Sequence, residues 1–284
     1  MTNPTIKIFA ANCFCRQARQ SISLLLLTLI LCFVVSAQET EEGDDFIDPT
    51  RPTVSESATI QKKGVLQLEY GGDFDFRSPD FRNRQAAPLD LTFAANKRLR
   101  LDFGFETVVS QKDSMGMRET GIGDVSLGFK AIARDKPDER LGIAFMYRVK
   151  LPTASEEKEL GTGRVDHNLR LIFNRKLDKN DFVFNVSYLN VGREDSDRRA
   201  SGAQMAFGFE RKLPKNFSLI TEVLGNSVDE EQPRGIYLLE ALTYKINKRL
   251  RFDVGARPGF GRDAPKIGIF AGFTVGVADL YRKK

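Results

Sequence analysis

The sequence has 284 residues, of which 41% are hydrophobic and 29% are charged, and its formal net charge is +5. Beyond residue 37 no apolar run approaches the roughly 18 residues of a membrane-spanning helix, which excludes a helical membrane protein. The three cysteines, Cys13, Cys15 and Cys32, all precede residue 37. The rest of the chain therefore has no disulfide, no thiolate metal site and no thiol nucleophile.

Residues 1–37 have the three parts of a secretory signal peptide. Lys7, Arg16 and Arg19 precede the uncharged run SISLLLLTLILCFVVSA, which ends at Ala37. A basic region, an apolar core and a small-residue exit site predict cleavage after Ala37. The alternative is a membrane anchor, but no stop-transfer flank follows the run. Cleavage leaves 40 basic residues against 38 acidic ones, a net charge of +2, which gives no reason to expect nucleic acid as a partner.

Residues 38–63 differ in composition from the chain beyond residue 63. They read QETEEGDDFIDPTRPTVSESATIQKK, which is rich in acidic residues and prolines and has few large apolar side chains. Such a segment cannot bury enough apolar surface to offset the entropy of ordering. We therefore expect a flexible periplasmic leader.

A two-residue period begins near residue 64 and continues to residue 277. In LRLDFGFETV (residues 99–108), leucine and phenylalanine alternate with arginine, aspartate, glycine and glutamate. This alternation is typical of a strand with one apolar and one polar face. We predict twelve strands, near residues 65–76, 86–95, 99–109, 122–133, 141–151, 164–176, 180–191, 202–212, 216–226, 236–246, 249–260 and 266–277.

Short and long connections alternate between these strands. The short ones carry turn residues, as in LDKND (177–181) and LPKN (213–216), and the long ones are more charged, as in SQKDSMGMRETG (110–121) and PTASEEKELGTG (152–163). Antiparallel neighbours joined in this way have all their long connections at one end. This pattern is typical of an outer-membrane barrel, with short periplasmic turns and longer outer loops.

Two barrels of opposite polarity fit this alternation. A secreted lipocalin-like barrel directs its apolar face inward, whereas a transmembrane barrel directs it outward. Strands of about ten residues match a tilted crossing of the bilayer, and twelve strands exceed what a side-chain-filled interior accommodates. The polar face is also rich in glycine, which suits a crowded concave wall. We therefore predict an all-β fold, a transmembrane antiparallel up-and-down β-barrel of about 12 strands.

The polar face, directed into the lumen, carries many charged residues. Burying unpaired charges in a dry interior costs several kcal/mol each, so either the lumen holds water or opposite charges pair across neighbouring strands. A wet lumen is a route for small solutes, and a fully paired one is a packing network that shuts the barrel. The residues that we predict to line the lumen are Arg100, Asp102, Glu106, Arg148, Lys150, Asp166, Arg170, Glu222, Arg251, Asp253 and Arg257.

No catalytic residue emerges from the sequence. The only histidine, His167, is predicted to face outward near the long connections. An outer-membrane phospholipase uses an outward histidine with a serine two residues later, and Leu169 stands there, so a lipid-acting enzyme is a less favoured alternative. The glycine-rich GIGDVS (121–126) and GTGRVD (161–166) lead into strands, whereas a phosphate loop needs a helix behind it. We expect no metal site and no cofactor.

Four glycine-rich segments stand out when they are taken together in chain order. They are DPTRPTVSESATIQKKGVLQLEYG (48–71), TGIGDVSLGFKA (120–131), RVKLPTASEEKELGTGRVD (148–166) and DAPKIGIFAGFTVGV (263–277). Together they resemble the MetA-pathway of phenol degradation family of outer-membrane transporter-like proteins. The resemblance implies a bacterial outer-membrane β-barrel that helps small solutes to cross, aromatic or apolar compounds among them.

The sequence thus divides into a signal peptide (1–37), a flexible periplasmic leader (38–63), a barrel (64–277) and a short basic C-terminal tail (278–284). The predicted function is a passive channel or transport component in the bacterial outer membrane, and the alternative is a closed structural or surface-interaction barrel. The expected partners are outer-membrane lipid and lipopolysaccharide, the barrel-assembly machinery and a small-molecule solute, with no nucleic acid.

Overall fold

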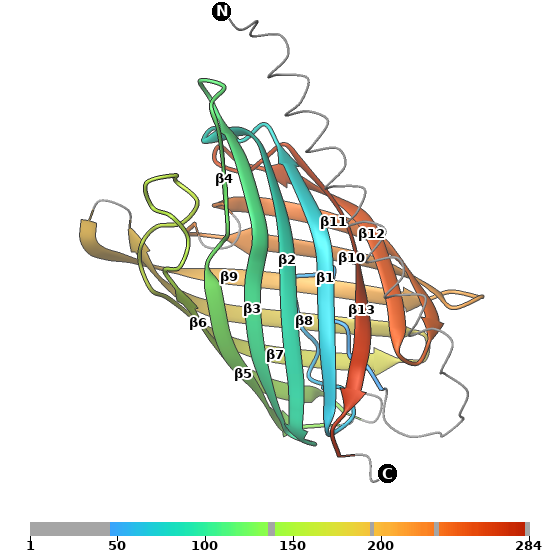
Figure 1. Cartoon of the computed structure of the whole chain (residues 1–284). Coiled ribbons are helices and arrows are strands. Elements are labelled where there is room, and N and C mark those ends of the chain that lie inside the picture. The colour runs from blue at the N-terminus through green and yellow to red at the C-terminus, as the bar shows by residue number, and fades with distance from the viewer. Residues whose placement is uncertain (1–45, 136–139, 194–195, 230–232, 282–284) are drawn as a thin grey trace, which may run out of the picture. The chain divides into compact units, whose positions relative to one another are not determined.

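The computed structural model describes residues 46–135, 140–193, 196–229 and 233–281, all within the unit Asp44–Lys284, and the predicted signal peptide lies outside these ranges. No described segment is a helix with the length and hydropathy needed to cross a membrane. The described chain forms 13 strands in one antiparallel sheet (Figure 1). They are β1 (Val65–Phe76), β2 (Phe81–Asn96), β3 (Leu99–Asp113), β4 (Arg118–Gly121), β5 (Val125–Arg134), β6 (Gly142–Leu151), β7 (Asp166–Leu177), β8 (Asn180–Arg193), β9 (Ser196–Lys212), β10 (Phe217–Asn226), β11 (Gly235–Asn247), β12 (Leu250–Phe260) and β13 (Ile267–Asp279).

The sheet closes because its first and last strands pair. β1 and β13 run antiparallel from the pair Val65 and Asp279 to the pair Phe76 and Ile267. From β5 to β13, each strand pairs with the next strand in the chain. Closure satisfies the backbone groups that an open sheet would leave unpaired at its edges.

Two of the strands share one position in the barrel. The first half of β3 pairs with β5, from Leu99 to Phe105, and its second half pairs with β4, from Val109 to Lys112. β4 and β5 therefore follow each other along the same edge of β3. The barrel has twelve strand positions, and the prediction of about 12 strands is confirmed.

Several strands extend further than the alternation of the sequence predicts. β3 continues to Asp113, β8 continues to Arg193 and β9 begins at Ser196. Much of the chain between the predicted strands, at residues 110–121 and 192–201, therefore belongs to hairpins. The alternation ends earlier than the hydrogen-bonded ladder because these segments carry charged residues on both faces.

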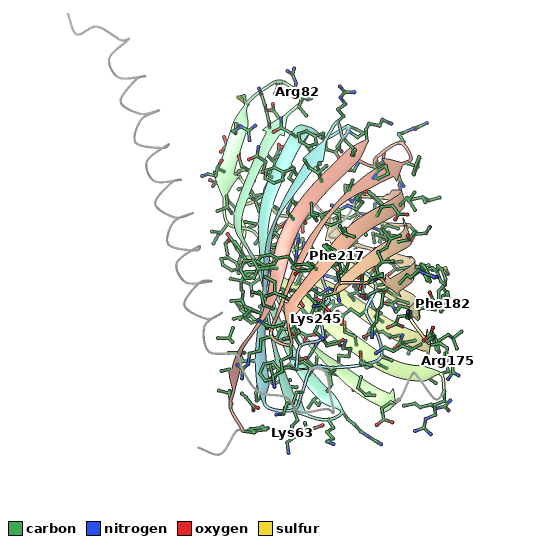
Figure 2. All side chains as sticks on the ribbon, turned by 90° about the vertical axis from the view of Figure 1, so that its right-hand side faces the viewer. Lys63, Arg82, Arg175, Phe182, Phe217 and Lys245 are labelled. Atoms are coloured by element: carbon green, nitrogen blue, oxygen red, sulfur yellow. The ribbon has the colours of Figure 1, made fainter. Side chains whose placement is uncertain are left out.

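The apolar face of the wall is directed outward, as predicted. On β7, Leu169 and Leu171 are 40% and 49% exposed. Asn168 and Arg170, which alternate with them along the strand, are each 7% exposed. Near the short turns the outer face also carries aromatic pairs, such as Phe217 and Tyr244 with ring centroids 4.7 Å apart. Figure 2 shows the side chains on both faces of the wall and labels Phe217.

The inner face is more varied than the predicted pattern of charge and glycine. Ile220 of β10, Leu239 and Ala241 of β11 and Phe270 of β13 form a buried apolar cluster on it. Most of the remaining inner wall is polar, and the buried polar residues include Gln67, Glu69, Asn174, Asn185, Gln204 and Thr274. Further apolar clusters lie on β5, β6 and β7, around Ile132, Met146 and Ile172, and on β9, β10 and β11, around Ala206, Leu224 and Tyr237. Apolar sectors therefore alternate with polar ones around the lumen.

Residues 46–63 lie inside the barrel, which differs from the predicted flexible leader. Their backbone and side chains hydrogen-bond to wall residues that are up to 202 positions away in the sequence, as between Arg51 and Asp253. We call residues 46–63 the inserted segment. The earlier part of the predicted leader, residues 38–45, lies outside the described ranges.

The predicted C-terminal tail is also attached to the barrel as far as the structure describes it. β13 continues to Asp279, and the N–H of Leu280 donates to the carbonyl of Gly64 at 2.8 Å. The Tyr281 ring packs edge-on against Phe93 with centroids 6.0 Å apart. This end of the chain therefore closes over the start of β1.

Candidate functional site: the lumen and its inserted segment

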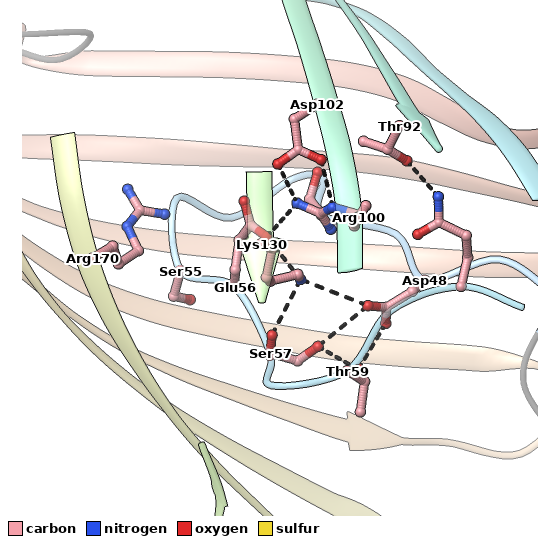
Figure 3. A network of polar contacts seen from close by, with 12 residues as sticks. Asp48, Ser55, Glu56, Ser57, Thr59, Thr92, Arg100, Asp102, Lys130 and Arg170 are labelled. Atoms are coloured by element: carbon pink, nitrogen blue, oxygen red, sulfur yellow. Dashed lines mark hydrogen bonds and ion pairs between the residues drawn. The ribbon is translucent and has the colours of Figure 1, made fainter. Parts of the chain in front are cut away.

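The inserted segment crosses the lumen and returns. It starts beside β1, where the N–H of Asp48 donates to Gln67 Oε1 at 2.8 Å. It reaches β10, where the N–H of Ser55 donates to Glu222 Oε2 at 2.6 Å. It then returns towards β2, where Gln61 donates to the Thr92 hydroxyl at 2.9 Å. Figure 3 shows the segment between strands of the wall.

Two wall carboxylates bind the backbone of the inserted segment. The segment has no neighbouring strand, so its buried N–H groups need other acceptors. Glu69 and Glu222, 0% and 1% exposed, supply them through charge-assisted hydrogen bonds. The donors are the N–H groups of Thr50 and Arg51 to Glu69, both at 2.8 Å, and those of Val54 and Ser55 to Glu222, at 3.1 and 2.6 Å.

Asn185 and Arg170 complete this attachment on the opposite wall. The Asn185 amide accepts from the N–H of Glu56 at 2.8 Å and donates to its carbonyl at 3.0 Å. It thus binds both backbone groups of one residue, as a neighbouring strand would. Arg170 Nη1 donates to the carbonyl of Val54 at 2.7 Å.

A buried charge cluster fixes the turn of the inserted segment (Figure 3). Glu56 Oε2 lies 2.6 Å from Arg100 Nη2 and 2.9 Å from Lys130 Nζ. Asp102 Oδ1 lies 2.6 Å from Arg100 Nε. We call Glu56, Arg100, Asp102 and Lys130 the charge cluster, and each of the four is at most 6% exposed. Two cations and two carboxylates balance, and one of the carboxylates belongs to the inserted segment.

The electrostatic environment keeps Glu56 ionised. Burial alone would favour the neutral carboxyl. The charges of Arg100 and Lys130, followed by those of Arg148 and Arg170, outweigh burial and hold the pKa of Glu56 well below its usual value. Glu56 therefore provides a permanent negative charge that compensates the cations of the wall.

Arg51 makes a second ionic contact, on the side of β1 and β12. Its Nη2 lies 3.3 Å from Asp253 Oδ1 and 3.7 Å from Asp73 Oδ1. Burial lowers the pKa of Arg51, but the charges of Asp253 and Asp73 outweigh it and the net pKa is raised. A Cβ at Gly272 would lie 2.5 Å from Arg51 Nε. Glycine at this wall position therefore leaves room for the guanidinium.

The predicted lumen-lining residues all lie on the inner face. Five of them act on the inserted segment: Arg100, Arg170, Glu222 and Asp253 by direct contact, and Arg148 through its charge on Glu56. Asp102 completes the charge cluster. The others pair with charges of the wall: Glu106 with Arg84 at 2.7 Å, Lys150 with Asp166 at 2.6 Å, Arg251 with Glu210 at 3.1 Å and Arg257 with Asp75 at 3.2 Å. Their part in solute passage stays a prediction.

The pattern of alternation could not identify the residues of the inserted segment itself. Arg51 and Glu56 stand in a stretch without periodicity, and their wall partners are between 18 and 202 positions away. One signal did point to this segment. The first segment of the family resemblance, 48–71, begins within the supposed leader.

Comparison with protein families agrees with that resemblance. The family model described as Putative MetA-pathway of phenol degradation matches residues 50–276, which is more than half of the chain. The chain belongs to this family. The match starts within the inserted segment, so family membership extends over most of the segment as well as the barrel. Among curated proteins, none matches the sequence.

Solved structures share the barrel. An outer membrane channel from Pseudomonas putida F1 has a TM-score of 0.58 and 13% identity, over 84% of this chain and 99% of that chain. Outer membrane phospholipase A from Escherichia coli has a TM-score of 0.44 and 15% identity, over 76% of this chain and 97% of that chain. The CymD monoaromatic hydrocarbon channel has a TM-score of 0.43 and 9% identity, over 78% and 90%. The similarity to the first supports the fold.

The charge cluster leads to a prediction for Glu56→Gln. The substitution keeps the shape of the side chain but leaves Arg100 and Lys130 without one of their counter-charges. We expect the docking of the inserted segment to weaken by about 3 kcal/mol. Hydrogen exchange of the amides of residues 54–57, in the protein purified in detergent, measures this opening. Glu119→Gln, an exposed carboxylate of β4, is the control and should leave the exchange unchanged.

The lowered pKa of Glu56 predicts how docking depends on pH. A depressed pKa in the docked state stabilises docking above the ordinary carboxyl pKa of about 4.3. This contribution is lost only when the pH falls through the lowered value. The NMR amide shifts of Ser55 and Glu56 should therefore stay constant from neutral pH to about pH 4.5. A change of these shifts centred between pH 5 and 7 would contradict the ionic anchor.

Close packing of the inserted segment predicts the effect of Gly208→Leu. A Cβ at Gly208 would lie 2.6 Å from Ser55 Oγ, so a leucine there occupies the space of the segment. We expect faster exchange at the Ser55 and Glu56 amides with the barrel intact by circular dichroism. Gly225→Leu is the matched control, because no atom lies within 4 Å of a Cβ at Gly225. Equal effects of the two variants would contradict the prediction.

Proposed function

We propose that the protein is a passive channel of the bacterial outer membrane for small solutes, aromatic or apolar compounds among them. In this proposal outer-membrane lipid and lipopolysaccharide surround the outer face of the barrel, and the barrel-assembly machinery inserts it. The apolar outer face supports contact with hydrocarbon, since Leu171, Phe207 and Val254 would otherwise be exposed to water at 49%, 49% and 55%. Family membership supports a role with small compounds.

The observation that carries the proposal is the space inside the barrel. A cavity of about 590 Å³ lies between the inserted segment and the inner wall of β7 to β12. Its lining includes the short turns at residues 178–179 and 213–216, so it reaches that end of the barrel. Solutes of the proposed size fit in a cavity of this volume. Passage to the other end requires the inserted segment to move, and the segment is therefore proposed as the gate.

A closed barrel is the second candidate, and the inserted segment favours it. The segment bonds to opposite walls through Glu69 and Glu222, and its charges are compensated at both sides. If the docked state never opens, the protein is a structural or surface-interaction barrel. The two candidates differ in whether the segment withdraws.

We propose no enzymatic activity. His167 lies on the outer side of the wall, where its Nδ1 lies 2.8 Å from the Tyr147 hydroxyl and the two rings stack. Leu169 occupies the position two residues later, where a lipid-acting site would need a serine. We expect wild type and His167→Ala to release fatty acid from mixed phospholipid micelles at equal rates.

Conductance in planar bilayers tests the channel proposal. Weakening the docked state by about 3 kcal/mol raises the withdrawn fraction about a hundredfold. We therefore expect Glu56→Gln to conduct far more often than wild type, and Glu119→Gln to behave as wild type. A wild type and a Glu56→Gln variant that both insert and never conduct at any voltage would establish the closed barrel. Swelling of liposomes in aromatic and polar solutes then ranks the substrates.

A further inference from the structure

The cavity beneath the inserted segment has an uneven distribution of charge. We call it the turn-end cavity, since it is lined by the ends of β7 to β12 near the short turns and by the inserted segment. Its lining holds seven lysines and arginines against four aspartates and glutamates. Arg51 and Arg251 pair with Asp253 and Glu210. The remaining cations of the lining are all lysines.

Two of these lysines, Lys212 and Lys245, lie two strands apart on the inner face. Lys212 of β9 pairs with Ser218 of β10, which pairs in turn with Thr243 of β11. Lys245 follows two positions after Thr243, on the same face, and pairs with Arg251 of β12. A row of hydroxyl groups and cations therefore runs across the mouth of the turn-end cavity. Such a row attracts anions and offers hydrogen-bond donors to a carboxylate.

The turn-end cavity also has an apolar patch on the wall. Val183 of β8 and Ile220 of β10 form it, and Gly208 adds no side chain beside them. The inserted segment lines the other side mostly with polar residues, among them Thr53 and Ser55. An apolar patch with a few convergent polar groups is typical of a small-molecule site.

We propose that the turn-end cavity binds small organic anions with an apolar body, of the chemical class of benzoate. Lys212 and Lys245 hold the carboxylate at the mouth, and the apolar body lies against Ile220 and Val183. The volume of about 590 Å³ is within the range of ligand pockets. This deepens the proposed function, because it names the class of solute that enters from the end with the short turns.

The acidic residues of the cavity limit what else it accepts. Asp181 and Glu210 are register partners on β8 and β9, deeper than Lys212. Glu210 is already paired there with Arg251 at 3.1 Å, and Asp181 accepts from Asn174, so the anionic end of the ligand is better placed beside the lysines at the mouth. A neutral compound of the same shape gains nothing from the lysines. The site therefore distinguishes benzoate from benzamide.

Binding of benzoate and benzamide to the full-length protein, purified in detergent, tests the proposal. Titration calorimetry should give tighter binding of benzoate than of benzamide. The double variant Lys212→Gln with Lys245→Gln should bind benzoate about tenfold more weakly. The matched control is Lys97→Gln with Lys248→Gln, two lysines of short turns at the same end that do not line the cavity, and it should bind as wild type.

Three results would overturn the proposal: no benzoate binding up to millimolar concentration, equal binding of benzamide, or equal weakening in both double variants. The measurement needs neither a membrane nor transport. If benzoate binds but Glu56→Gln never conducts, the anion site is supported and the channel proposal is contradicted. If Glu56→Gln conducts but benzoate does not bind, the channel proposal is supported and the anion site is contradicted.

Discussion

Charge compensation across the lumen is the constraint on which the interior of this protein depends. The outward apolar face forces the polar side chains of the strands inward, and there they must find partners at low cost. Arg100 pairs with Asp102 of its own strand, whereas Lys130 pairs with Glu56 of the inserted segment. Glu56 also pairs with Arg100, so the segment supplies one of the two carboxylates that these cations need. The same segment brings Arg51 to the carboxylate of Asp253.

The inserted segment in turn depends on the wall for its own backbone. It crosses the lumen without a strand beside it, and acceptors from Glu69, Asn185 and Glu222 take the place of a ladder. Barrel and segment therefore stabilise each other, and neither has its polar groups satisfied alone. This mutual dependence makes the segment suited to a gate.

The interior is also divided along its length. The charge cluster and the backbone contacts lie where the inserted segment crosses, and the turn-end cavity lies between the segment and the short turns. An apolar cluster on β10, β11 and β13 borders this region through Ile220. In the proposed channel, a solute that enters from the short turns would meet lysines first, then an apolar surface, and then the inserted segment.

The sequence by itself determined the barrel. A two-residue period repeated over twelve strands fixes which side chains face lipid and which face the lumen, because successive side chains of a strand point to opposite faces. It therefore predicted the inner position of residues such as Arg170 and Asp253. Only the tertiary structure decided where residues 46–63 lie. A polar segment without periodicity has no local preference, and its partners, such as Asn185 for Glu56, are 129 residues away until the barrel closes.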